Sequence, residues 1–157
     1  MPFMSGGDDV QLRTRESAGG RREVFCPLRR RWVALTPEEC VRQLFTLRLT
    51  RELGYPATLM AHEVELRIGA KRVRCDTIVY DSHLRPLIIV EYKSADVPLS
   101  QSAVDQVMTY NTVLRAPLLI LTNGRELLCW HPDYARGTCS FLDSLPHYDE
   151  ISDITAL

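Results

Sequence analysis

The sequence lacks the features that mark several large classes of protein. It has no apolar run near the roughly 18 residues of a membrane-spanning helix, and no N-terminal signal segment. Its five cysteines form no Cys-x-x-Cys pair, and its four histidines show no zinc-ligand spacing. The Gly-x-Ser-x-Gly element of serine hydrolases is also missing. We therefore expect a cytoplasmic protein with reduced thiols, no structural zinc and no membrane span.

Length and composition predict one globular domain. The chain has 157 residues, of which 45% are hydrophobic and 25% are charged, as in ordinary soluble domains. Residues 1–20 are rich in glycine and charge and contain little to bury, which predicts a flexible N-terminal arm. We expect residues 21–157 to form a single domain.

The net charge of −1 gives no overall signature of nucleic-acid binding, so any such affinity must come from local clusters of basic residues. One cluster precedes Asp76 and consists of Lys71, Arg72 and Arg74. The other lies in the first fifth of the chain and consists of Arg13, Arg15, Arg21, Arg22, Arg29, Arg30 and Arg31. Either cluster is also compatible with an ordinary solvated surface.

Two strand-like segments carry the most informative residues of the chain. Residues 72–80 and 87–93 are separated by 81–86, whose Asp, Ser and Pro are typical of a turn. A hairpin centred on 83–84 would place Asp76 opposite Glu91, with Lys93 on the same face because strand side chains alternate. Two carboxylates and one ammonium group are therefore expected to converge on an otherwise apolar sheet.

A divalent cation would explain this convergence. Carboxylates that face each other on a sheet repel, and buried carboxylates are costly unless they are paired or bound to a metal. Two carboxylates are the usual protein share of a Mg²⁺ site, and the lysine would neutralise charge that develops on a phosphate. A structural salt bridge between Lys93 and one of the acids is the alternative.

A helix is predicted over 101–114, with Val104, Val107, Met108 and Leu114 as its apolar stripe. Gln106 and Tyr110 lie one turn apart on one face, where they could contact a phosphate or orient the strand with Glu91 and Lys93. A partly buried surface pair is the alternative for these two residues.

The remaining patterns predict an α/β fold in which a mixed β-sheet is flanked by α-helices. A short extended piece near 32–34 leads into the first helix, and the chain then follows the order α-β-β-β-α-β-β. The expected helices cover 37–52 and 101–114, and the further expected strands lie at 63–68, 116–122 and 126–130. Residues 133–157 are weakly patterned, with a possible small packing element at 140–146.

Asp76, the segment Glu91-Tyr92-Lys93 and the later Gln106-x-x-x-Tyr110 resemble the PD-(D/E)XK nuclease superfamily. More narrowly, the chain is similar to the N-terminal nuclease domain of type I restriction enzyme R (HsdR) subunits, over about residues 23–132. The segment 27–43 resembles the first helix of that family. One departure is Cys75, which precedes Asp76 where the superfamily is named for a proline.

The resemblance implies a restriction-endonuclease-like fold and a role for each matching residue. Asp76 and Glu91 would bind Mg²⁺ or Mn²⁺, Lys93 would be the catalytic lysine, and Gln106 and Tyr110 would support the substrate or the catalytic strand. Glu39 matches a position where many such nucleases carry a further metal-binding acid. Within Thr36-Pro37-Glu38-Glu39 it also fits a capping box, in which its carboxylate reaches back to the helix start.

We therefore predict a metal-dependent DNA endonuclease whose products, by analogy with the family, carry 5′-phosphate and 3′-hydroxyl ends. The expected partners are DNA and other restriction or defence subunits. A non-catalytic module that binds nucleic acid or protein on the same fold is the main alternative, and a structural protein whose acids only form salt bridges is a third.

Overall fold

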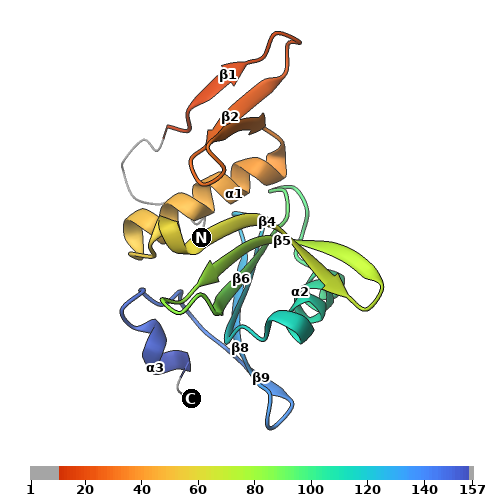
Figure 1. The fold of residues 1–157 in the computed structure, drawn as a ribbon, viewed down its shortest axis with the longest axis vertical. Helices are drawn as coiled ribbons and strands as arrows, with labels where there is room; N and C mark the ends of the chain where they lie inside the picture. The colour runs from red at the N-terminus through yellow and green to blue at the C-terminus, as the bar shows by residue number, and fades with distance from the viewer. Residues whose placement is uncertain (1–10, 156–157) are drawn as a thin grey trace.

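The computed structural model describes residues 11–155, with side chains as far as Asp153. A six-stranded mixed sheet forms its centre, and a smaller three-stranded sheet stands at one end (Figure 1). Residues 1–10 of the predicted N-terminal arm lie outside the described residues. Thr14–Glu16 forms strand β1, so this part of the predicted arm of 1–20 is a paired strand.

The central sheet confirms the predicted α/β fold. Its strands lie side by side in chain order: β4 (Met60–Ile68), β5 (Lys71–Tyr80), β6 (Pro86–Tyr92), β7 (Leu118–Thr122), β8 (Leu127–Asp133) and β9 (Thr138–Phe141). All neighbours pair antiparallel except β6 and β7, which are parallel because a helix connects them. Strand β9 was not predicted, because the segment 138–141 is short and exposed throughout and therefore shows no hydrophobic pattern of a strand.

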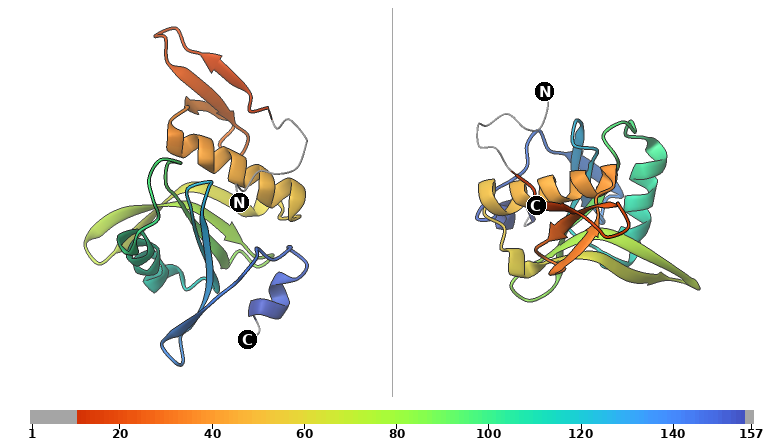
Figure 2. Two further views of the ribbon diagram at one scale, coloured as in Figure 1. Left: turned by 180° about the vertical axis from the view of Figure 1, so that it is seen from behind. Right: turned by 90° about the horizontal axis from the view of Figure 1, so that it is seen from above.

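Helices cover both faces of this sheet (Figure 2). Helix α1 (Pro37–Leu47) continues into one π-helical turn (Arg48–Glu52), which together match the helix predicted over 37–52. Helix α2 (Gln101–Leu114) lies on the opposite face, and the short helix α3 (Ile151–Thr155) ends the described chain. A 3-10 turn (Ala57–Leu59) leads into β4. None of the described helices is long and apolar enough to cross a membrane.

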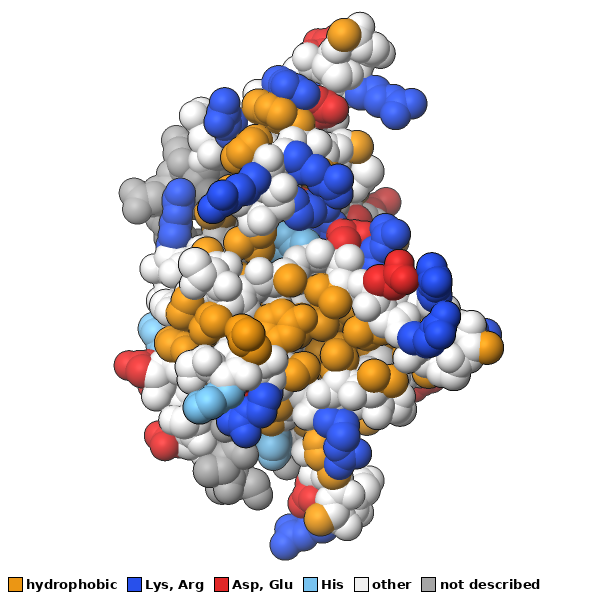
Figure 3. All heavy atoms as spheres, viewed as in Figure 1, with side chains coloured by type: hydrophobic (Ala, Val, Ile, Leu, Met, Phe, Trp, Pro, Cys, Tyr) orange, Lys and Arg blue, Asp and Glu red, His pale blue; other side chains and the backbone are white. Residues whose placement is uncertain are grey.

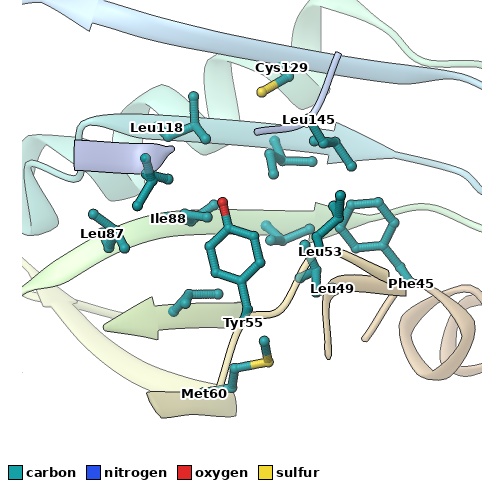
Figure 4. Close-up of a cluster of buried hydrophobic side chains, with 14 of the residues drawn as sticks. Phe45, Leu49, Leu53, Tyr55, Met60, Leu87, Ile88, Leu118, Cys129 and Leu145 are labelled. Atoms are coloured by element: carbon teal, nitrogen blue, oxygen red, sulfur yellow. The ribbon is translucent and has the colours of Figure 1, made fainter. Parts of the chain in front are cut away.

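The alternation of side chains along the central strands divides the core into two layers. Phe45 and Leu49 of α1 pack with Ile88 and Leu118 of the sheet, and Tyr55 joins them from the following loop (Figure 4). The Tyr55 hydroxyl donates a hydrogen bond to the Pro146 carbonyl at 2.9 Å, which ties the C-terminal segment to this layer. The second layer lies under α2 and contains Ile78, Ile89, Val107, Leu119 and Trp130.

The buried face of α2 differs from the predicted stripe. Met108 is 38% exposed, whereas Asn111, which was not expected in the core, is buried. Asn111 can be buried because its amide is satisfied: its Nδ2 donates to the Ala116 carbonyl at 3.2 Å, and its Oδ1 accepts from the Ala116 N–H at 2.7 Å. The other buried residues of this helix are Ala103, Val107 and Tyr110.

The smaller sheet was predicted only as an extended piece near 32–34. It consists of β1 (Thr14–Glu16), β2 (Arg22–Cys26) and β3 (Arg31–Ala34), all antiparallel. It stands above α1, away from the C-terminal end of the chain (Figure 1).

Candidate active site

The hairpin of β5 and β6 has the predicted register. Thr77 pairs with Val90, Ile78 with Ile89 and Val79 with Ile88, and Asp76 and Glu91 are the next residues beyond this ladder. Nearer the turn the register shifts between Val79 and Tyr80, which the symmetric hairpin centred on 83–84 did not include. At that point a side chain replaces the backbone partner, since Asp76 Oδ2 accepts a hydrogen bond from the Tyr92 N–H at 2.9 Å. The Asp76 carboxylate is thereby fixed at the carboxyl end of β6.

The backbone of the neighbouring strand is irregular at the same place. The pairing of β4 with β5 is interrupted between His62–Thr77 and Val64–Cys75, and Glu63 has a positive φ of 56°. A non-glycine residue with positive φ is costly and persists only where its surroundings enforce it. The register is the same on both sides of Glu63, so this is a local distortion beside Asp76 without an extra residue. Met60 before it packs in the core layer under α1, whereas Leu66 after it packs in the layer under α2.

Asp76 and Glu91 form a buried carboxylate pair. Their exposed fractions are 8% and 4%. Burial, reinforced by the charge of Asp76, raises the pKa of Glu91 to about 9, although Lys93 opposes the shift. Burial also raises the pKa of Asp76, against the lowering effects of the Tyr92 N–H and Arg42. Glu91 Oε2 is buried without any hydrogen-bond partner, so a ligand that supplies positive charge would stabilise this carboxylate.

The other three predicted residues meet on the α2 side of this pair. Lys93 follows β6 directly and is half-buried, and its backbone N–H donates to the Thr122 carbonyl at 2.9 Å. Its ammonium Nζ lies 3.4 Å from Gln106 Oε1, and Gln106 Nε2 donates to the Tyr110 hydroxyl at 2.6 Å. Burial and the nearby Glu91 charge raise the pKa of Tyr110. The structure therefore brings Asp76, Glu91, Lys93, Gln106 and Tyr110 into one connected group.

Arg42 on α1 was missed by the sequence analysis and lies at the centre of a buried ion network. Its guanidinium is 4% exposed, donates from Nη1 to Glu39, and donates from Nη2 to Glu63 at 2.7 Å and to Asp76 at 3.2 Å. Burial lowers the pKa of Arg42, but Glu39, Asp76 and Glu63 together raise it above its usual value. Arg42 lies three residues before Phe45 and seven before Leu49, which are both buried, and this helical spacing was the signal that could have identified it.

The Glu39 carboxylate, predicted as a third metal ligand, is engaged by two arginines and a glutamine. Its oxygens accept hydrogen bonds from Arg29, Arg42 and Gln43. Within residues 11–155, no group of three or more His, Cys, Asp or Glu side chains is arranged to hold a metal ion. The role of Glu39 at a metal stays a prediction.

Only one of the two hydrogen bonds of a capping box with Glu39 is formed. The Glu39 N–H donates to Thr36 Oγ1 at 3.0 Å, but the Thr36 N–H bonds to the Ala34 carbonyl and not to the Glu39 carboxylate. The acid of this helix whose charge acts on the site is Glu38. Burial and the charge of Asp76 raise its pKa, and its own charge raises that of Glu91.

The sequence matches the family described as the type I restriction enzyme R protein N terminus (HSDR_N) over residues 37–146. The chain belongs to this family. A fragment described as an HsdR subunit of a type I restriction enzyme from Vibrio vulnificus YJ016 has the same fold, with a TM-score of 0.57 and 22% identity. That similarity covers 76% of this chain and 25% of the other. No curated protein matches the sequence.

The range matched to the HSDR_N family contains the whole connected group. It begins at the first residue of α1 and includes β4 to β9 and α2. The smaller sheet of β1, β2 and β3 lies outside it. The recognition of an HsdR N-terminal domain is thus confirmed for the part of the chain that carries the candidate site.

Proposed function

We propose that this chain is a metal-dependent DNA endonuclease domain of the PD-(D/E)XK type. The observation that carries the proposal is the buried Glu91 Oε2, which lacks a hydrogen-bond partner beside a second buried carboxylate. Such a pair is unfavourable by itself and becomes favourable around a cation. The proposed substrate is DNA, and the proposed partners are other subunits of a restriction or defence system.

Mg²⁺ or Mn²⁺ fits the donor set, because hard divalent cations prefer carboxylate oxygens. Asp76 and Glu91 would hold the ion. When bound, it would act as a Lewis acid on the scissile phosphate and lower the pKa of water. The donor set contains two carboxylates and no soft ligand, which argues against a thiophilic metal. The nearby Cys75 thiol does not change this, because burial raises its pKa and keeps the thiol protonated.

Lys93, the Gln106–Tyr110 pair and Arg42 would then each have a separate role in hydrolysis. Lys93 would place its positive charge beside the phosphate, where negative charge grows during attack by water. Gln106 would hold the Lys93 ammonium group in position, and Tyr110 would in turn hold the Gln106 amide. Arg42 would keep the Asp76 carboxylate oriented through its contact with Oδ1.

A non-catalytic nucleic-acid or protein interaction module is the second candidate, and one observation favours it. Arg42 Nη2 lies 3.2 Å from Asp76 Oδ1, so the fold itself supplies a positive charge to one of the two carboxylates. A buried acid that is paired within the protein has less need of a metal. A measurement of metal binding therefore distinguishes the endonuclease, which requires the ion, from the interaction module, which does not.

Calorimetric titration is expected to show Mn²⁺ binding more tightly than Mg²⁺ to the wild type, and Asp76→Asn should abolish most binding of either. Both carboxylates are needed because two anionic oxygen donors are the protein's share of such a site. Asp143→Asn removes an exposed acid elsewhere and should bind like the wild type. Equal binding by wild type and Asp76→Asn would remove the metal site from the proposal.

The same titration should depend on pH in a definite direction. The metal must displace the proton of Glu91, whose pKa is about 9 in the metal-free protein. Below that pH the observed affinity should therefore rise with pH, by up to about tenfold per unit for one released proton. A flat profile between neutral pH and the pKa of Glu91 would contradict its role as a ligand.

Gln106→Ala is expected to slow cleavage by roughly two- to twelvefold, as the loss of one hydrogen bond worth about 0.5–1.5 kcal/mol implies, with little change in melting temperature. Tyr110→Phe keeps the buried ring but loses the bond to Gln106, so it should also cost about 1 kcal/mol of stability. Gln101→Ala on the exposed face of the same helix is the matched control. If Gln106→Ala loses stability but cleaves normally per folded molecule, this pair is structural.

A further inference from the structure

We propose that the outer face of the β1–β2–β3 sheet binds the phosphate backbone of DNA that flanks the candidate active site. The proposal rests on the proposed function for its substrate, but on a different part of the molecule. This sheet lies outside the range matched to the HSDR_N family, so the family match does not account for it.

The strand register separates the two faces of this sheet. Arg15 pairs with Glu23, and Phe25 pairs with Trp32, which places these side chains on one face together with Arg13. The opposite face carries Val24 and Cys26, which are completely buried. The face with the arginines and aromatics is therefore the outer one.

Arginine and aromatic side chains stack on this outer face. The Arg15 guanidinium carbon lies 4.2 Å from the centre of the Trp32 ring, and that of Arg13 lies 5.0 Å from the Phe25 ring and 5.2 Å from the Trp32 ring. Arg13 and Arg15 are exposed, while Phe25 and Trp32 are half-buried. Stacking fixes the planes of the guanidinium groups. Arg15 Nε also donates to Glu23 Oε2 at 2.7 Å, so contacts to phosphate oxygens would come from the Nη groups of Arg15 and from Arg13.

The charge of the sheet suits an anionic polymer. Residues 11–36 contain seven arginines and two glutamates, although the whole chain has a net charge of −1. Figure 3 shows Lys and Arg side chains gathered over this end of the molecule and over the tip of the β4–β5 hairpin. Phosphate contacts from such clusters supply most of the sequence-independent affinity for DNA.

The sheet is also held at the side of the candidate site. Arg29, in the turn between β2 and β3, donates to Glu39 on α1, and Glu39 accepts from Arg42, which contacts Asp76. Both Arg29 and Glu39 are largely buried, so this chain of ion pairs fixes the turn relative to α1. DNA with its scissile phosphate near Lys93 would pass close to this turn, and this continuity favours DNA over an unrelated acidic protein.

The test measures DNA binding in the Lys93→Ala background, by fluorescence anisotropy of a labelled duplex over a series of salt concentrations. Arg13→Gln with Arg15→Gln should weaken binding and reduce the slope of log affinity against log salt by roughly 2, about 1 for each lost phosphate contact. Arg13→Lys with Arg15→Lys keeps the charge and should retain most of the slope. Arg85→Gln with Arg136→Gln removes two exposed arginines from other turns and should leave the slope unchanged.

Hydrolysis of bis(p-nitrophenyl) phosphate with Mn²⁺, measured without the Lys93→Ala change, separates this proposal from the proposed function. This small diester needs only the candidate active site, so the Arg13/Arg15 glutamine variant should hydrolyse it like the wild type. A wild type that cleaves neither substrate, with the expected loss of slope in the glutamine variant, supports the DNA-binding face and rejects the endonuclease. An unchanged slope in the glutamine variant, or an equal loss in the Arg85/Arg136 variant, overturns the proposal.

Discussion

Replacing Lys93 with alanine is expected to lower the rate of DNA cleavage by about 10²–10³, with metal and DNA affinity nearly intact. The ammonium group stands beside the buried Glu91 and is held by Gln106 at 3.4 Å. Its charge interacts most strongly with the phosphate when negative charge has grown there, so its loss raises the barrier more than it weakens binding. Single-turnover cleavage under saturating protein measures the chemical step alone.

Lys71→Ala provides the matched control, because Lys71 is an exposed lysine at the far end of β5. It should leave the single-turnover cleavage rate unchanged, because saturating protein removes any effect of the basic cluster that contains Lys71 on DNA affinity. A wild type that binds DNA but cleaves nothing with either metal would favour the interaction module. Equal cleavage rates for wild type and Lys93→Ala would show that Lys93 is not a catalytic residue of the proposed nuclease.

Arg42→Met is expected to lower the free energy of unfolding by about 3–5 kcal/mol, the range for breaking a buried ion pair from one side. The substitution removes the cation that contacts Glu39, Glu63 and Asp76. Asp76 then loses its ion-pair partner while it stays buried, and Glu39 keeps only Arg29 as a cationic partner. Urea denaturation at neutral pH with a chelator present measures the loss. Arg51→Met, at an exposed position just after α1, should change the stability by well under 1 kcal/mol.

Two further measurements show whether the loss comes from uncompensated charge. Glu39→Gln combined with Arg42→Met should be less destabilised than the sum of the single changes, because both changes break the same ion pair between Arg42 and Glu39. Mn²⁺ should stabilise Arg42→Met more than the wild type, since it would replace a positive charge beside Asp76. Additive effects and no metal dependence would show that Arg42 contributes mainly by packing.

The sequence alone was sufficient for the hairpin that carries the site. The apolar runs on both sides of residues 81–86 are short and continuous, as in strands buried on both faces, and the turn residues between them predict a hairpin that pairs Thr77 with Val90. The register shift between Val79 and Tyr80 was not predictable from this local pattern. The start of α1 was also predictable, because Thr36 and Pro37 act within one turn of the chain and Thr36 Oγ1 accepts the Glu39 N–H. These features depend on neighbours along the chain, and so local patterns predict them.

The smaller sheet and strand β9 could not be predicted in the same way. Their strands are three to five residues long and mostly exposed, so hydrophobic alternation has little room to appear. The buried face of α2 was predicted from hydrophobicity, which favoured Met108 over Asn111. Asn111 is buried because its amide bonds to the Ala116 backbone, a contact that residue type does not reveal.

At the candidate site, the sequence by itself determined that Asp76, Glu91 and Lys93 share one end of a hairpin, and that Gln106 and Tyr110 share a helix face. Only the tertiary structure decided that this helix face meets Lys93, that Glu39 is engaged by arginines, and that Arg42 lies against Asp76. The physical reason is that the field at a charged group depends on every element packed around it. Residues 34 positions apart, such as Arg42 and Asp76, become partners only when the helix settles on the sheet.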